Sequence, residues 1–273
     1  MGARAPWKQR LDQLTADRGR LCIGIDPMPQ VLKAWGLPAT SQGLETCARG
    51  IVEVLGLEAA VFKPQSAFFE AYGSAGIAVL ERLLADIAAV GALSLLDVKR
   101  GDIGSSMAGY AAAYLDDGSP LAADAITVSP YLGVGALEPA FTRAVAGGRG
   151  IYVLARTSNP EGHAVQTARV GAGTLAQHVV DEVTSGNPGR DYAVGLVVGA
   201  THDDLGCRVA DFNGSILVPG IGAQGGTIDD VIRVFGAAAR HVLPTASREV
   251  IGGGKDELLQ RFGKLRTQAA LLP

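Results

Sequence analysis

The chain has 273 residues, of which 48% are hydrophobic and 19% charged, with a net charge of -3. This composition is typical of a globular protein, excludes a disordered chain, and leaves no basic surface for nucleic acid. No segment approaches the run of about 18 apolar residues that a membrane span needs. Residues 1–10 lack an apolar signal-peptide core, so we expect a cytoplasmic protein that does not contact membranes.

The first predicted element is an amphipathic segment over 7–19, in which Trp7, Leu11 and Leu14 share a face that could cover one end of a barrel. After it, short runs rich in Leu, Ile and Val alternate with longer segments of helical spacing. The runs are predicted strands, at 21–26, 59–65, 93–99, 125–130, 150–158, 192–200, 215–222 and 241–247. The longer segments are predicted helices, at 42–57, 74–90, 105–116, 134–146, 172–185, 202–210, 227–239 and 255–272.

This alternation predicts a parallel sheet built from βα units. Each strand is nearly continuous in apolar residues, as strands covered on both faces are. Eight such strands favour a (β/α)8 barrel, and we predict one domain over 1–273 because no linker-like change in composition interrupts the chain. A doubly wound open sheet is the structural alternative.

The cysteines and histidines give no sign of a metal site. Cys22, Cys47 and Cys207 are odd in number and contain no C-x-x-C pair, and the four histidines have no metal-ligand spacing. We therefore predict neither a disulfide framework nor a metal site, and a reducing compartment fits.

Polar residues collect where the predicted strands end, which is where (β/α)8 barrels build their active sites. Asp97 and Lys99 are two residues apart in the third strand and should point to the same side. A single charge here could be a salt bridge or a helix cap, but many charges in one partly dehydrated site carry a desolvation penalty that favours function. The strand-end residues are Asp26, Lys63, Asp97, Lys99, Asp102, Ser158, Asn159, Gln224 and Arg248.

The stretch PGIGAQGG at 219–226 contains G-x-G-x-x-G. In a dinucleotide-binding domain, this motif would lie at the first βα turn, with an acidic residue about 20 positions later. Here it follows the seventh strand, and that acidic residue is missing. The better interpretation is a phosphate site formed with Arg248 and Gln224, because barrels commonly bind phosphate after strands seven and eight. A merely tight turn is the alternative.

With these residues in place, the chain resembles the orotidine 5'-phosphate decarboxylase family, particularly its bacterial branch with mycobacterial members. The most specific element is D-x-K-x-x-D-I at 97–103. The resemblance implies cofactor-free decarboxylation to uridine 5'-phosphate, the last step of de novo pyrimidine biosynthesis. It implies that Lys99 donates a proton to C6 and that Asp97 faces the departing carboxylate. It also implies a homodimer with shared sites, in which the partner contributes Asp102 while Lys63 completes a Lys/Asp chain.

The resemblance assigns the remaining site residues to substrate binding. Asp26 would bind the ribose hydroxyls and Ser158 the pyrimidine edge, and Gln224 and Arg248 would hold the phosphate. Ile103 and Ser106 would come from the partner, near the pocket and the ribose. The chain departs from some members at Ile251, where they carry a Tyr that touches the phosphate.

Three alternatives stay open from the sequence. A sugar-phosphate decarboxylase acting on 3-keto-L-gulonate 6-phosphate shares D-x-K-x-x-D, but carries a Glu for magnesium at the position of Lys63. An aldolase could use Lys99 as a Schiff base, and a non-catalytic barrel could bind a phosphate ligand. Arg100 should lie on the opposite face by strand alternation, in a structural role or at a dimer interface.

Overall fold

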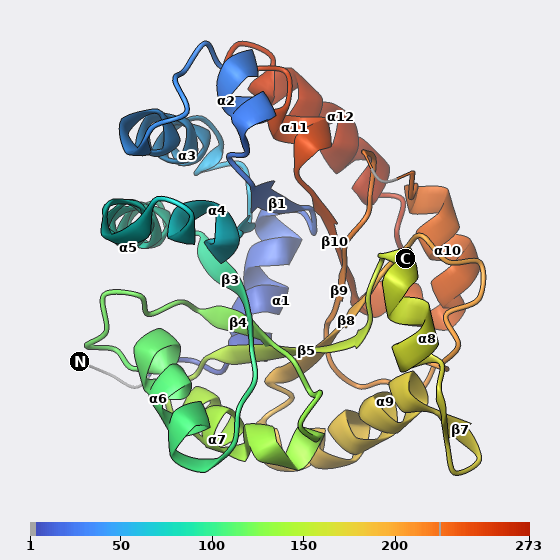
Figure 1. Ribbon diagram of the computed structural model, residues 1–273. Coiled ribbons are helices and arrows are strands. Elements are labelled where there is room, and N and C mark those ends of the chain that lie inside the picture. The colour runs from blue at the N-terminus through green and yellow to red at the C-terminus, as the bar shows by residue number, and fades with distance from the viewer. Residues whose placement is uncertain (1–3, 224) are drawn as a thin grey trace.

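The computed structural model describes residues 4–223 and 225–273. Eight parallel strands close into a barrel in the order β1-β10-β9-β8-β5-β4-β3-β2, which confirms the predicted (β/α)8 fold (Figure 1). The barrel strands are β1 Cys22–Ile25, β2 Val61–Pro64, β3 Leu93–Arg100, β4 Ala125–Val128, β5 Gly150–Arg156, β8 Val194–Val198, β9 Ile216–Val218 and β10 Val242–Ala246.

Helices precede, connect and follow the barrel strands, and most of them surround the barrel (Figure 1). They are α1 Trp7–Arg18, α2 Pro29–Ala34, α3 Ser41–Leu55, α4 Ser66–Glu70, α5 Gly73–Ala89, α6 Gly104–Leu115, α7 Glu138–Ala146, α8 His163–Gln166, α9 Leu175–Gly186, α10 Ile228–Phe235, α11 Arg248–Ile251 and α12 Leu258–Ala269. No helix in the described ranges has the length and apolar character to cross a membrane.

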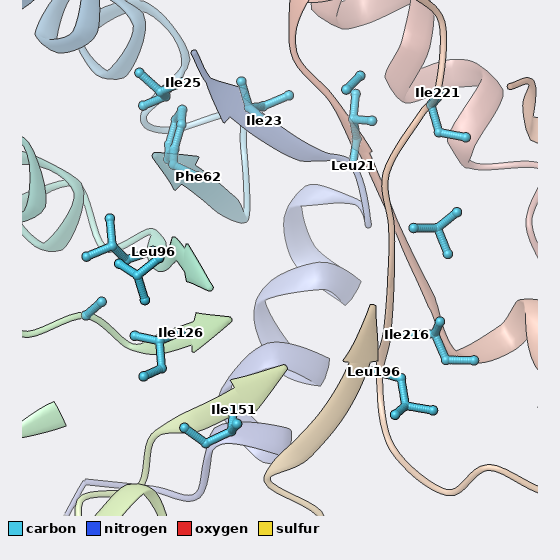
Figure 2. Close-up of a cluster of buried hydrophobic side chains, with 14 of the residues drawn as sticks. Leu21, Ile23, Ile25, Phe62, Leu96, Ile126, Ile151, Leu196, Ile216 and Ile221 are labelled. Atoms are coloured by element: carbon cyan, nitrogen blue, oxygen red, sulfur yellow. The ribbon is translucent and has the colours of Figure 1, made fainter. Parts of the chain in front are cut away.

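The barrel strands bury both faces, which explains their nearly continuous apolar sequence. Outward-facing side chains pack under the helices in a layer that includes Ile23, Phe62, Leu96 and Ile126 (Figure 2). Residues in alternate positions fill the barrel interior; Cys22, Leu95, Ala125, Val197 and Leu217 belong to this second cluster. This interior is mainly apolar, with the buried Tyr152 hydroxyl donating to Ser215 Oγ at 3.0 Å, and the charged residues of the cavity lie at the strand ends.

Helix α1 covers the floor of the barrel, as its amphipathic sequence predicts. Trp7 is 1% exposed and meets the ring of Tyr152 edge-on, with 6.2 Å between ring centroids. Gly150 at the start of β5 makes room for the indole, since a Cβ there would lie 2.7 Å from Trp7 ring atoms. Arg10 anchors the helix through an ion pair with Asp124, 2.6 Å between Nη1 and Oδ1. The open end is therefore the other one, where the strands finish.

The predicted helix over 202–210 is wrong, because the structure has turns and irregular backbone there. Gly206 adopts a left-handed conformation with φ of +66°, and its N–H donates to Asp204 Oδ1 at 2.8 Å. This local turn competes with helix formation. The sequence pattern did not predict four short helices (α2, α4, α8 and α11). It also did not predict the hairpin of β6 Arg169–Val170 and β7 Gly173–Thr174, which lies between β5 and α9.

Candidate active site

A cavity of about 340 Å³ opens at the carboxyl ends of the strands. Seven of the residues predicted at the strand ends line it: Asp26, Lys63, Asp97, Lys99, Ser158, Asn159 and Arg248. Asp102, Ile103 and Ser106 lie outside it, on the loop after β3 and the first turn of α6. Gln224 lies outside the described residues. A larger depression of about 1000 Å³ between α10 and α12 contains none of these side chains.

The carboxylate of Asp97 is the centre of the cavity's polar network. Its Oδ1 accepts hydrogen bonds from Lys99 Nζ and Thr127 Oγ1, each at 2.7 Å. Its Oδ2 accepts from Lys63 Nζ at 3.2 Å and Gln65 Nε2 at 3.0 Å. Both oxygens therefore have two donors, and strands β2, β3 and β4 jointly fix the orientation of the carboxylate.

The ion pairs around Asp97 determine its protonation. Burial would raise the pKa of Asp97, but Lys63 and Lys99 outweigh burial and hold this pKa well below its usual range. Burial would likewise lower the pKa of Lys63, but Asp97 and Asp26 hold it above its ordinary value. The site therefore keeps an ionised Asp97 carboxylate beside a charged, buried Lys63 ammonium at neutral pH.

The two lysines differ in exposure. The side chain of Lys63 is 7% exposed and that of Lys99 is 45% exposed. Lys63 is therefore held inside the barrel, while the ammonium of Lys99 can meet a ligand in the cavity. With Arg248, three cations and two carboxylates (Asp26 and Asp97) line the cavity, a balance that favours an anionic ligand.

Strand β3 is irregular where it delivers Lys99. The pairing with β4 shifts register between Leu96 and Arg100, and Lys99 has a φ of +47°. Lys99 still converges with Asp97, as predicted, but through this bulge rather than through regular alternation. Arg100 turns away and pairs with Glu70 on α4, with 2.6 Å between Nη2 and Oε1, which agrees with a structural role.

Three polar atoms on the β1 and β10 side of the cavity lack partners. Asp26 Oδ1, Thr245 Oγ1 and Ser247 Oγ are buried and make no hydrogen bond within the described part of the chain. Buried polar atoms cost free energy when unpaired, so a ligand with hydroxyl groups would satisfy them. Gly24 allows this close packing, because a Cβ there would lie 2.6 Å from Ser247 Cβ.

Arg248 begins α11 and faces the loop after β9 across the cavity, where Gly220, Ile221 and Ala223 contribute to the lining. Gly220 and Gly222 have φ values of +100° and +76°. Such conformations favour glycine. The N–H of Gly222 donates to the carbonyl of Gly226 at 2.8 Å, which closes the loop on itself beside Arg248. Ile251, at the end of α11, is fully buried and does not line the cavity.

The loop after β5 carries Ser158, and hydrogen bonds from neighbouring side chains fix this loop. Gln166 on α8 accepts the N–H of Thr157 at 3.0 Å and donates to its Oγ1 at 2.8 Å. Thr201 Oγ1 donates to the carbonyl of Ser158 at 2.7 Å. Gly199 packs directly below, since a Cβ there would lie 2.6 Å from Ser158 Cα. The backbone of Ser158 is thus fixed at the cavity wall.

The sequence interpretation missed two residues that touch Asp97. Gln65 follows Lys63 by two positions, so strand alternation could have placed it on the same face. Thr127 lies in β4 with its side chain turned inward, but a threonine in an apolar strand gives no distinguishing signal.

Comparisons with known proteins agree with this geometry. A sequence model described as the orotidine 5'-phosphate decarboxylase / HUMPS family matches residues 19–258. A Salinispora tropica protein named orotidine 5'-phosphate decarboxylase is 54% identical over 255 residues, covering 92% of each chain. One of the same name from Streptomyces coelicolor is 49% identical over 256 residues, covering 92% of this chain and 91% of the relative.

Solved structures are similar as well. A putative orotidine 5'-phosphate decarboxylase from Streptomyces avermitilis has a TM-score of 0.92 at 45% identity, covering 98% of this chain and 96% of its own. A Leishmania donovani UMP synthase has a TM-score of 0.81 at 30% identity, covering 98% of this chain and 57% of its own. Similarity therefore extends over nearly the whole chain in both sequence and fold.

Proposed function

This chain belongs to the orotidine 5'-phosphate decarboxylase / HUMPS family, and from this premise we propose that it converts orotidine 5'-phosphate to uridine 5'-phosphate and carbon dioxide. The observation that carries the proposal is the Lys63–Asp97–Lys99 array at the open end of the barrel, in which Lys63 and Asp97 are buried and Lys99 is accessible. The reaction is the last step of de novo pyrimidine biosynthesis.

The chemistry requires charge stabilisation at one carbon atom. When the bond from C6 to the carboxylate carbon breaks, its electron pair stays on C6 in the ring plane, where no neighbouring carbonyl can delocalise it. Lys99 has a cavity-facing ammonium that would stabilise this charge and then transfer a proton to C6. This step needs no metal or cofactor, because one side chain provides both the charge and the proton.

Asp97 would act on the leaving group and on Lys99 together. Its position supports placing it against the substrate carboxylate, while its Oδ1 holds the Lys99 ammonium at 2.7 Å. Two like charges about 4 Å apart repel by roughly 4 kcal/mol at an effective dielectric constant near 20. Departure of carbon dioxide relieves that repulsion. Lys63 would keep Asp97 ionised from the other side.

The ribose, the pyrimidine edge and the phosphate of the nucleotide would contact residues of the cavity walls. Asp26 would bind the ribose hydroxyls, supported by the unpaired atoms around it. Ser158 would meet the pyrimidine edge, and Arg248 would bind the phosphate together with Gln224. These remote contacts provide binding energy that can be used at the reacting carbon.

We further propose a homodimer in which each site takes residues from its partner. Asp102, Ile103 and Ser106 lie beyond the cavity of their own chain, and Ile103 is 62% exposed. The loop after β4 lies beside this segment, since Ser129 N–H donates to the carbonyl of Arg100 at 2.8 Å. This loop exposes Tyr131 (80%) and Leu132 (53%), and exposed large apolar side chains on these two neighbouring segments would suit contact with a second copy.

The proposed setting is cytoplasmic, with no nucleic-acid or membrane partner. All three cysteines are free, and Cys22 and Cys47 are buried, which suits a reducing compartment.

The decisive experiment is a spectrophotometric assay of purified protein with orotidine 5'-phosphate in the presence of a chelator. We expect conversion to uridine 5'-phosphate, and a loss of at least about 1000-fold in kcat for Lys99→Ala. The matched control is Lys33→Ala on α2, which lies outside the cavity and should keep wild-type activity. Absence of turnover by the wild-type protein, or turnover that requires a divalent metal, would contradict the proposal.

A further inference from the structure

Thr127 on β4 contacts both of the central reactive residues. The residue is 1% exposed. Its Oγ1 donates to Asp97 Oδ1 at 2.7 Å and accepts the backbone N–H of Lys99 at 2.9 Å. A hydroxyl has one proton and two acceptor lone pairs, so it can perform both functions at once. One side chain thus joins the carboxylate of Asp97 to the peptide of Lys99.

The peptide of Lys99 needs such a partner. In the pairing of β3 with β4, Leu96 lies opposite Ile126 and Arg100 opposite Val128, so residues 97–99 stand against Thr127 alone. The Thr127 hydroxyl therefore takes the place of a ladder acceptor. It also supports the φ of +47° at Lys99, a conformation that costs about 1–2 kcal/mol in a residue with a Cβ.

This backbone conformation determines where the Lys99 ammonium lies. The Lys99 side chain is 45% exposed, so packing alone does not fix it, unlike the buried Lys63. Two hydrogen bonds position Lys99 instead. Its ammonium donates to Asp97 Oδ1, and its backbone N–H donates to Thr127 Oγ1. Thr127 makes the second bond directly and supports the first through Asp97, because its hydroxyl donates to the same Oδ1 that accepts from the ammonium.

We propose that Thr127 is a positioning residue for the decarboxylation, which holds the Lys99 ammonium and the Asp97 carboxylate in the arrangement that the reaction requires. This inference rests on the proposed function. Thr127 acts through Lys99 and Asp97, so its loss affects the rate of the chemical step more than substrate binding, for which the phosphate and ribose contacts lie elsewhere in the cavity.

The test compares Thr127→Val, which keeps the shape and removes the hydroxyl, with Thr127→Ser, which keeps the hydroxyl. Displacing a reacting group by about 1 Å can lower a rate roughly 100-fold. We expect Thr127→Val to lower kcat about 100-fold with KM within about 3-fold. We expect Thr127→Ser to stay within about 10-fold of the wild type in kcat, since its hydroxyl can make the same bonds.

Two further measurements separate positioning from folding. Thr184→Val is the matched control, because its hydroxyl bonds only to the carbonyl of Val180 in α9 among the residues that the structure describes. Its kcat should equal that of the wild type. A crystal structure of Thr127→Val should show Lys99 with a changed φ or an ammonium moved from Asp97 Oδ1. If Val at 127 prevents folding, Thr127→Cys provides a graded variant with a weak donor, and its kcat should fall between those of Thr127→Ser and the Lys99→Ala variant.

The outcomes are distinct. If the wild type is active, three results would overturn this inference alone. They are a folded Thr127→Val that is as fast as the wild type, equal losses of kcat in Thr127→Val and Thr127→Ser, and a Thr127→Val structure in which Lys99 is unchanged. Wild-type protein that does not decarboxylate orotidine 5'-phosphate would overturn both the inference and the proposed function.

Discussion

At the scale of a single residue, Asp97 shows how hydrogen bonds and ion pairs stabilise a buried charge. Its carboxylate is 9% exposed at the side chain and accepts hydrogen bonds from Lys63, Gln65, Lys99 and Thr127. Burying an ion pair costs solvation free energy that is recovered only when the remaining lone pairs and protons also find partners. Asp97 meets that condition, so removing its charge leaves Lys63 buried without its main counter-ion.

This arrangement predicts a pH-dependent stability effect for Asp97→Asn. Breaking a buried pair by removing one partner costs about 3–5 kcal/mol in the free energy of unfolding, and we expect that loss at pH 7. Because the pKa of Asp97 is lowered in the folded protein, its stabilising contribution is present above the unfolded value of about 3.9 and is lost as the pH falls through the lower folded value.

The measurement is urea unfolding of the wild type and Asp97→Asn between pH 3 and 8. The difference between them should be constant from about pH 5 to 8 and shrink below about pH 4. Asp203→Asn is the matched control, because Asp203 is 93% exposed in its pair with Arg233 and should change stability by less than about 1 kcal/mol. A difference that grows on acidification would contradict the assigned direction.

At the scale of the element, helix α1 shows that the two ends of the barrel have separate functions. Trp7 and Leu11 belong to the same buried cluster as the interior residues Leu95 and Leu217, so α1 completes the barrel core from below. The reactive side chains lie at the opposite, carboxyl ends of the strands. Stability and activity should therefore respond separately to substitutions at the two ends.

Trp7→Ala tests this separation. Truncating a buried Trp removes its transfer free energy and leaves a cavity, at a cost of about 3–5 kcal/mol in the free energy of unfolding. Folded Trp7→Ala should keep kcat and KM close to wild-type values, as measured well below its melting temperature. Leu14→Ala serves as the control, since Leu14 on the same helix is only partly buried and should cost less. A large fall in kcat in the folded variant would show that the floor and the site are coupled.

At the scale of the whole molecule, one chain presents an incomplete set of the predicted site residues. Asp102 lies outside the cavity. Among the residues that the structure describes, its side chain accepts a hydrogen bond only from the N–H of the adjacent Ile103. In a dimer with two-fold symmetry, each copy would offer the same segment to the other. The proposed active unit is therefore the pair of chains.

Mixing two inactive variants tests this proposal. Lys99→Ala and Asp102→Ala should each be nearly inactive. Refolded or exchanged together in equal amounts, they should regain about a quarter of wild-type activity, since half of the dimers are mixed and each holds one intact site. Mixing Lys99→Ala with Asp97→Ala is the control and should restore nothing, because both residues belong to the same chain's half of the site. Continued inactivity of verified mixed dimers would rule out a contribution from the partner.

The sequence by itself determined the barrel and most of its polar residues. Each strand buries both faces, so its apolar run is visible locally, and its end can be located within a few residues. The eight strands and the placement of Asp26, Lys63, Asp97, Lys99, Ser158 and Arg248 at one cavity followed from this pattern. The D-x-K-x-x-D-I motif identified the family because its spacing is contained within one strand and loop.

Only the tertiary structure decided how these groups are held. Thr127 and Lys99 are 28 residues apart, and Gln65 and Asp97 are 32 apart, so their bonds depend on the register of neighbouring strands. The bulge at Lys99 and the turn at Gly206 are backbone conformations that residue type alone does not specify. Apolar periodicity is encoded along the chain, whereas hydrogen bonds between strands exist only after the barrel has closed and set the register.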